Sequence, residues 1–441
     1  MPKVSFYTLG CKVNQAETEE MLASFAKAGF EWVDSSEEAD VRVVNTCTVT
    51  KEADRKSRQA IRRAVQNRGN GDGRALVVVT GCYAEISPEE VCRIPGVDLV
   101  VSQSEKDKLV EKVIDLMGVT PEVSISQDNC GPKGPPLHCS GRPLGRLFSS
   151  KIPRLRTRAF LKIQDGCNNF CSYCIVPFAR GRERSQPYKE IVTEAQELVR
   201  GGVKEIVLTG VHLGRYREDE KGLADLLRDI SKIPDVGRIR LSSLEPEEVT
   251  SELVSLIRES GKVCRHLHLP LQSGDDGVLK AMRRNYTTGD FVSLVSDIKR
   301  EIPGVAVTTD VMVGFPGETD EQFNRTKELC EKLEFARLHV FKYSPRVGTA
   351  AAKFADQVSE EVKHQRSQIL IDLGERLAWK FRERFIGRKM DVLVEKKTNG
   401  KLTGLTDNYI RVCFDGPETL MGQIVSVKLL NNIGVRPPVV L

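Results

Sequence analysis

The stretch Gly166-Cys167-Asn-Asn-Phe-Cys171-Ser-Tyr-Cys174 places three thiols in one short segment, directly after an expected strand at Ala159–Gln164. Thiolates in such regular, close spacing are the usual ligands of iron–sulfur clusters. Three ligands leave the fourth iron of a 4Fe–4S cube without a protein thiolate, and an open position keeps a metal available to a substrate. We therefore expect Cys167, Cys171 and Cys174, the central triplet, to hold a catalytic cluster.

A structural zinc site is the alternative for the central triplet. Zinc sites usually pair two Cys-x-x-Cys units or add histidines. No fourth ligand stands nearby in the sequence. The spacing therefore favours a cluster over zinc.

The bulk composition is that of an ordinary globular protein, with 441 residues, 40% hydrophobic and 29% charged. At roughly 150 residues per domain, about three domains are expected. The sequence shows no apolar run near the roughly 20 residues of a membrane helix and no signal peptide, so a cytoplasmic location is expected. Disulfides are rare there, so the 12 cysteines point first to metal or redox sites. The net charge of +5 is too mild to indicate a nucleic-acid partner by itself.

Strands and helices alternate through residues 153–386, the region around the central triplet. This alternation predicts a parallel sheet, and six units predict a partial (β/α)6 barrel. The expected strands are Ala159–Gln164, Glu205–Thr209, Arg238–Ser242, His266–Leu269, Ala306–Val313 and Leu338–Tyr343.

Two other domains are expected on either side of this barrel. Residues 1–117 predict a three-layer α/β domain with buried parallel strands. Residues 118–152, which contain Cys130 and Cys139, are rich in Pro and Gly and predict a linker. Residues 387–441 predict a small β-barrel of short strands separated by turns.

A second set of cysteines, the N-terminal triplet, comprises Cys11, Cys47 and Cys82. Each follows an expected strand, and the gaps between them are about one β–α unit long. In a parallel sheet all carboxyl ends lie on one edge, so these thiols can converge. The alternative is three small buried side chains, as free cysteines often are.

Further motifs accompany the two triplets: Thr8-Leu-Gly-Cys11-Lys-Val-Asn-Gln15, Leu269-Pro-Leu-Gln272-Ser-Gly274, Val313-Gly-Phe-Pro-Gly-Glu-Thr319 and Thr406-Asp-Asn-Tyr409. Together they resemble the radical S-adenosylmethionine methylthiotransferases over nearly the whole chain. The C-terminal module resembles the RNA-binding TRAM barrel.

The resemblance implies two 4Fe–4S clusters and S-adenosylmethionine as cofactors. The open iron at the central triplet would chelate S-adenosylmethionine, with Tyr173 against its adenine. The N-terminal triplet would hold a second cluster that carries the sulfur to be inserted. One S-adenosylmethionine would methylate this sulfur, and another would yield a radical that takes hydrogen from an adenine ring. A radical is needed because an aromatic C–H bond has no proton that a side-chain base could remove.

The family has three branches, which act on isopentenyladenosine in tRNA, on threonylcarbamoyladenosine in tRNA, or on an aspartate of a ribosomal protein. The segments Gly10–Gln15 and Tyr343–Thr349 resemble the threonylcarbamoyl branch. The expected partners are therefore tRNA, an electron donor such as flavodoxin or ferredoxin, and a sulfur source. The other two branches remain alternatives, as does a non-catalytic iron–sulfur RNA-binding protein.

Polar residues at strand ends are further candidates for the site, because barrel enzymes place functional groups there. Ser242 and Gln272 could bind S-adenosylmethionine, although hydrogen bonding within loops is an equal alternative. His266 and His268 share one face of a strand, and we favour hydrogen-bonded core residues over a site role for them.

Four residues are the candidate RNA contacts. Arg283 and Arg284 follow Met282, while Tyr409 and Arg411 are expected on one face of a C-terminal strand. An aromatic ring beside a guanidinium can stack on an unpaired base and bind a phosphate. Burial of Tyr409 in the barrel core is the alternative.

Overall fold

The computed structural model describes residues 1–69, 74–118 and 157–430. It divides into two compact units: the first holds the described residues up to Gly118 apart from Val49–Lys51, and the second holds the rest. The expected linker with Cys130 and Cys139 lies almost wholly outside the described residues. Within the described part, no helix is both long and apolar enough to span a membrane.

The first unit is built on a five-stranded parallel sheet in the order β2-β1-β3-β4-β5. Each strand pairs in register with its neighbour, so that Thr8 lies opposite Asn45 and Thr46 opposite Gly81. The carboxyl ends of β1, β3 and β4 therefore form one edge. The strands are β1 (Lys3–Thr8), β2 (Glu31–Trp32), β3 (Val41–Thr46), β4 (Leu76–Gly81) and β5 (Leu99–Val100).

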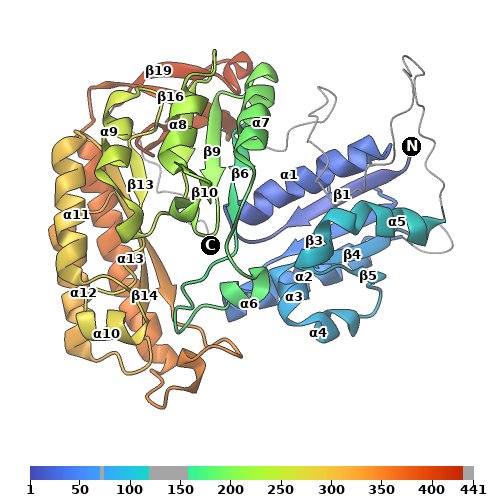
Figure 1. The fold of residues 1–441 in the computed structure, drawn as a ribbon, viewed down its shortest axis with the longest axis horizontal. Coiled ribbons are helices and arrows are strands. Elements are labelled where there is room, and N and C mark those ends of the chain that lie inside the picture. The colour runs from blue at the N-terminus through green and yellow to red at the C-terminus, as the bar shows by residue number, and fades with distance from the viewer. Residues whose placement is uncertain (70–73, 119–156, 431–441) are drawn as a thin grey trace. The chain divides into compact units, whose positions relative to one another are not determined.

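Helices cover both faces of this sheet (Figure 1). Because side chains alternate along a strand, Val43 packs with α1 (Lys12–Lys27) and α5 (Leu109–Met117). Val44 faces the other layer, formed by α2 (Lys51–Gln66), α3 (Cys82–Ile86) and α4 (Pro88–Cys92). The predicted three-layer α/β domain is confirmed.

The second unit contains the predicted partial barrel of six parallel strands. Two three-stranded sheets, β6-β9-β12 and β13-β14-β15, are joined by bridges from Ile239 to Val263 and from Ser243 to His268. The strands are β6 (Ala159–Lys162), β9 (Glu205–Thr209), β12 (Arg238–Leu241), β13 (His266–His268), β14 (Ala306–Val313) and β15 (Arg337–Lys342).

Helices cover the outside of the barrel (Figure 1). The outer face of the sheet, which meets these helices, is apolar. Val307 and Val311 of β14 are fully buried, and Leu338 of β15 lies against Gly374. The covering helices are α7 (Tyr188–Arg200), α8 (Leu223–Ser231), α9 (Ser251–Glu259), α11 (Thr288–Glu301), α12 (Asp320–Leu333) and α13 (Glu360–Glu383).

One predicted strand is shorter than expected. Ala159–Gln164 is split, because β6 ends at Lys162 and β7 (Gln164–Asp165) pairs antiparallel with β8 (Arg184–Ser185). This small hairpin ties together the two ends of the loop that carries the central triplet.

The C-terminal residues form an antiparallel sheet in the order β18-β17-β16-β19. Through Leu430, the last described residue, no ladder closes β18 onto β19. The sheet packs on the amino-terminal ends of the barrel strands, because Ile410 and Val412 share a core with Ala306 and Phe381. Its strands are β16 (Lys389–Thr398), β17 (Lys401–Thr406), β18 (Arg411–Phe414) and β19 (Ile424–Lys428).

Candidate metal centres and cofactor site

The central triplet lies in the loop between β7 and α6 (Val176–Arg180). Backbone hydrogen bonds fix this loop: Cys174 N donates to Cys171 O at 3.0 Å, and Cys167 N donates to Gly181 O at 3.1 Å. A Cβ at Gly166, whose φ is +73°, would lie 2.0 Å from Arg182 O. Only glycine allows the two ends of the loop to approach so closely.

Hydrogen-bond donors surround the sulfur atoms of the triplet. Asn169 N donates to Cys167 Sγ at 3.5 Å, and His212 Nδ1 lies 3.7 Å from the same sulfur. The Arg284 guanidinium donates to Cys171 Sγ at 3.5 Å. These groups stabilise negative charge on two of the three sulfurs.

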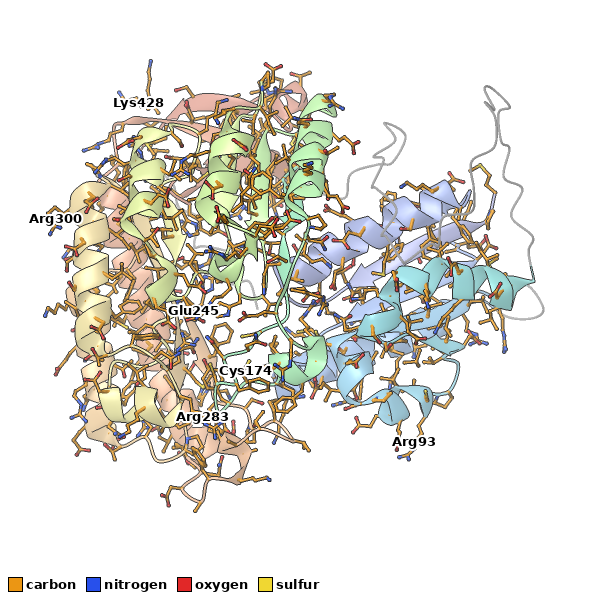
Figure 2. All side chains as sticks on the ribbon, viewed as in Figure 1. Arg93, Cys174, Glu245, Arg283, Arg300 and Lys428 are labelled. Atoms are coloured by element: carbon orange, nitrogen blue, oxygen red, sulfur yellow. The ribbon has the colours of Figure 1, made fainter. Side chains whose placement is uncertain are left out.

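Buried carboxylates hold the two cationic side chains in place. Glu248 lies 2.7 Å from His212 Nε2, and Glu245 forms an ion pair with Arg284. Both carboxylates come from the turn after β12, where Figure 2 labels Glu245. Burial alone would lower the pKa of His212, but Cys167 and Glu248 raise it to about 11. Glu183 Oε1 also lies 2.9 Å from its Nδ1, so carboxylates near both ring nitrogens favour the charged form of His212.

The chemistry of the central triplet suits a cationic metal cluster. Burial raises the pKa of Cys171, and burial together with the charge of Cys171 raises that of Cys174 to about 12. Such thiols would stay protonated without a metal, whereas bound iron keeps them as thiolates. The three sulfurs and their donors therefore fit an iron–sulfur cluster.

The residues expected to bind S-adenosylmethionine lie in different surroundings. Tyr173 packs beside the cluster of Met282, Phe315 and Tyr343, and burial raises its pKa well above the usual value. Gln272 has a left-handed backbone, with φ of 64°, and its amide and carbonyl continue the pairing with β14. Its backbone therefore has a structural role.

Ser242 is the strongest of these candidates on geometry. Its hydroxyl is buried and has no hydrogen-bond partner within the described residues, as is also true of Thr209. The two residues end neighbouring strands, since Ser242 N donates to Leu208 O. Buried hydroxyls normally find partners, so these two fit a polar ligand such as the expected cofactor.

The N-terminal triplet lies at the carboxyl ends of β1, β3 and β4, three neighbouring strands. Cys11 precedes α1 and is exposed, while Cys47 and Cys82 are 5% exposed. A Cβ at Gly10 would lie 3.0 Å from Cys47 Sγ, so the chain before Cys11 passes directly over Cys47.

The Asn14 side chain links the ends of the strands that carry Cys11 and Cys47. Its amide donates to Leu9 O at 2.7 Å and to Thr46 O at 2.9 Å, which joins the ends of β1 and β3. Cys47 is held in turn by Ser57, whose hydroxyl donates to Cys47 O at 2.8 Å. Three thiols on one sheet edge, two of them recessed and one open to solvent, fit a cluster with an accessible side.

The structure corrects two of the expected RNA contacts. Arg284 has only 4% of its side chain exposed and is committed to Glu245 and Cys171, so it is not available to RNA. Tyr409 precedes β18 instead of lying on it, and its ring stacks on His266 at 4.3 Å between centroids. The predicted shared face of Tyr409 and Arg411 is therefore wrong.

The other two RNA candidates remain accessible. Arg283 is exposed in the turn after α10 (Asp276–Ala281). Arg411 keeps 29% of its side chain exposed and lies 3.5 Å from Glu395. Their contact with RNA stays a prediction.

The sequence reading missed the layer of residues around the central triplet, above all His212, Glu183 and Glu248. Their positions at strand ends indicate a site role: His212 follows β9 and Glu248 follows β12, and strand ends in such barrels carry functional groups. Their pairing across 36 residues could not be read from the sequence.

Comparison with known proteins supports the same assignment. Residues 3–102 match the Uncharacterized protein family UPF0004, residues 161–330 match the Radical SAM superfamily, and residues 383–431 match the TRAM domain. The "Threonylcarbamoyladenosine tRNA methylthiotransferase MtaB" of Bacillus subtilis is 43% identical over 98% of this chain and 94% of its own length. This chain belongs to the radical S-adenosylmethionine methylthiotransferases.

Other members of the family resemble the chain over a similar extent. The MtaB protein of Thermotoga maritima is 39% identical over 99% of this chain and 96% of its own length. A "tRNA-2-methylthio-N(6)-dimethylallyladenosine synthase" of Acetivibrio thermocellus is 36% identical over 96% of this chain and 87% of its own length.

A solved structure shares the fold. The radical S-adenosylmethionine methyltransferase TsrM from Kitasatospora setae superposes with a TM-score of 0.57 at 17% identity, over 80% of this chain and 74% of that one. At this identity the likeness concerns the fold alone. It agrees with the partial barrel seen in the second unit of this chain.

Proposed function

We propose that this enzyme adds a methylthio group to the adenine ring carbon of threonylcarbamoyladenosine next to the anticodon of tRNA. The observation that carries the proposal is 43% identity, over nearly the whole of both chains, to a protein named for this reaction. The two cysteine triplets supply the ligands that such a reaction needs.

In the proposed mechanism, the cluster ligands, the residues beside them and the cofactor contacts have separate tasks. A 4Fe–4S cluster with bound S-adenosylmethionine supplies the radical chemistry that breaks an unreactive C–H bond. The central triplet would hold this cluster, while His212 and Arg284 would stabilise the charge on its sulfur ligands. Ser242 and Thr209 would offer hydroxyls to the cofactor, and Tyr173 would lie against its adenine.

The N-terminal triplet would hold a second cluster, which carries the sulfur for insertion. Exposed Cys11 and the two recessed thiols Cys47 and Cys82 support this assignment, because a cluster there would keep one side accessible. An electron donor such as flavodoxin or ferredoxin, a separate sulfur source and a cytoplasmic location complete the proposal.

Isopentenyladenosine in tRNA is the second candidate substrate. Its support is the 36% identity to a protein named tRNA-2-methylthio-N(6)-dimethylallyladenosine synthase. The higher identity to the MtaB proteins of Bacillus subtilis and Thermotoga maritima favours threonylcarbamoyladenosine.

Anaerobic turnover with matched substrates tests the choice. The reconstituted full-length protein, S-adenosylmethionine and a reductant would be supplied with anticodon stem-loops carrying either modified base, or with a ribosomal-protein peptide. Mass spectrometry should detect a methylthio product from the threonylcarbamoyl RNA. Product from the isopentenyl RNA or the peptide alone would assign the enzyme to another branch, and no product from any substrate would favour a non-catalytic RNA-binding protein.

A further inference from the structure

Three neighbouring strands of the barrel carry a polar cluster that the proposed mechanism does not use. His268 of β13, Asp310 of β14 and His339 of β15 have ligand atoms that all lie within 4.8 Å of one another. Asp310 and His339 are direct partners in the β14–β15 register. His268 Nε2 is 3.2 Å and His339 Nδ1 is 3.5 Å from Asp310 Oδ1.

The cluster faces the inside of the barrel. The opposite face of the same strands is apolar and covered, since Val311 is fully buried and Leu338 packs on α13. Side chains alternate along a strand, so Asp310 and His339 point away from those helices. They therefore belong to the inner surface, where a substrate base could enter.

In the group formed by His268, Asp310 and His339, the His268 end is held by hydrogen bonds, and the His339 end is the more exposed. His268 Nδ1 lies 2.9 Å from Thr308 Oγ1, a hydroxyl that is also 3.0 Å from His266 Nε2. Side-chain exposure rises from 10% at His268 to 24% at Asp310 and 37% at His339. A ligand would thus meet His339 first, with Asp310 held firmly behind it.

An exposed aromatic ring lies beyond the cluster on the same strand. Phe341 is two residues after His339, so it shares the inner face and lies about 7 Å further toward the carboxyl ends. It is 43% exposed. Aromatic rings of this kind stack on unpaired bases, and the carboxyl ends are where the loop with the central triplet emerges.

We propose that His339 and Asp310, supported by His268, bind the threonylcarbamoyl group of a base stacked near Phe341. This group offers urea N–H donors, which suit the Asp310 carboxylate, and an amino-acid carboxylate, which suits an N–H donor of the His339 ring. An isopentenyl group offers neither donor nor acceptor, and burying the cluster against it would leave polar groups unsatisfied.

This inference rests on the proposed function and adds the residues that select the substrate. A site built to hydrogen-bond a polar substituent rejects an apolar one strongly, because its own groups lose their partners. Loss of one such bond to a charged group corresponds to about tenfold in affinity. The preference for threonylcarbamoyl RNA should fall by about that factor when His339 is removed.

Binding measurements on the full-length, cluster-loaded protein test the inference. Anticodon stem-loops would carry unmodified adenosine, threonylcarbamoyladenosine or isopentenyladenosine at one position. Wild type should bind the threonylcarbamoyl RNA about tenfold or more tightly than the unmodified RNA. His339→Phe and Asp310→Asn should lose this preference but bind the unmodified RNA as wild type does. His364→Phe, the same change on an exposed part of α13, should keep the preference.

Iron content and cleavage of S-adenosylmethionine in each variant show whether the barrel remains intact. An unchanged preference in both His339→Phe and Asp310→Asn would overturn the inference, and so would a wild type without preference. Loss of a bound non-iron metal from His339→Phe, with the preference intact, would assign the cluster to a cation instead. The proposed function is judged separately, by whether wild type forms any methylthio product from the threonylcarbamoyl RNA.

Discussion

Glu205 is the residue whose loss should reveal how the C-terminal sheet is fastened to the barrel. Its fully buried carboxylate receives hydrogen bonds from Arg238 Nε at 2.5 Å and from Arg240 Nε at 2.8 Å. The same guanidinium groups donate onward to backbone carbonyls of the C-terminal sheet: Arg238 to Leu405 O at 2.9 Å and Arg240 to Thr406 O at 3.0 Å. One carboxylate therefore holds both of the arginines that join the barrel to the C-terminal sheet.

The size of the effect follows from the pKa of Glu205. Burial would raise this pKa, but Arg240 and Arg238 lower it from 4.5 to about 2. At 1.36 kcal/mol per pKa unit, the ionised carboxylate contributes about 3 kcal/mol to the free energy of unfolding. Glu205→Gln should remove about this much at neutral pH, in line with the 3–5 kcal/mol typical of breaking a buried ion pair.

The pH dependence carries the test. Because the folded pKa lies below the unfolded one, the contribution is complete above pH 4.5 and is lost as the pH falls toward 2. Urea unfolding followed by circular dichroism should give a constant deficit for Glu205→Gln from pH 7 to about 5. The deficit should shrink below pH 4.5.

A matched control separates this network from surface charge. Glu259→Gln breaks an exposed ion pair with Arg258, of 2.7 Å, and should leave stability unchanged. A deficit for Glu205→Gln no larger than that of the control, or one that stays constant down to pH 3, would refute the electrostatic account.

Three further predictions concern the clusters. Replacing the whole central triplet by Ala should leave about four irons per chain at the N-terminal triplet; loss of all iron, measured chemically, would contradict separate sites. Cys47→Ala should still cleave S-adenosylmethionine to 5′-deoxyadenosine but form no methylthio product, and product from this variant would refute the sulfur-carrier role. Arg284→Gln, made together with Glu245→Gln, removes a hydrogen-bond donor to Cys171 without leaving a buried carboxylate unpaired. The reduction potential of the central cluster should fall by about 60 mV or more. Redox titration followed by electron paramagnetic resonance measures this, and the exposed neighbour Arg283→Gln should not change it.

Local patterns in the sequence were sufficient to predict the fold. Strand and helix periods depend on residues close together in the chain, and Ala306–Val313 was expected with the bounds that β14 has. The spacing of the central triplet is local as well, so its place in a loop after the first barrel strand could be predicted. The N-terminal triplet could be predicted only from the sheet topology, because parallel strands bring their carboxyl ends to one edge.

The roles of individual charged and aromatic side chains were decided by tertiary structure. Arg283 and Arg284 are adjacent in the sequence, yet one is exposed while the other is buried against Glu245 and Cys171. Tyr409 was expected to face RNA, but its ring covers His266 at the base of the barrel. Deleting residues 388–441 would therefore remove the hydrogen-bond partners of Arg238 and Arg240 as well as the RNA contact expected of Arg411.

What the sequence determined by itself was the chemistry: which residues can hold iron, and in which order strands and helices follow. Only the tertiary structure decided which side chains contact one another. Contacts such as Cys167 with His212, or Asp310 with His339, join residues from different β–α units. Neither partner carries a local signal for the other, because the pairing depends on how strands align across the sheet and on which side chains burial leaves facing inward.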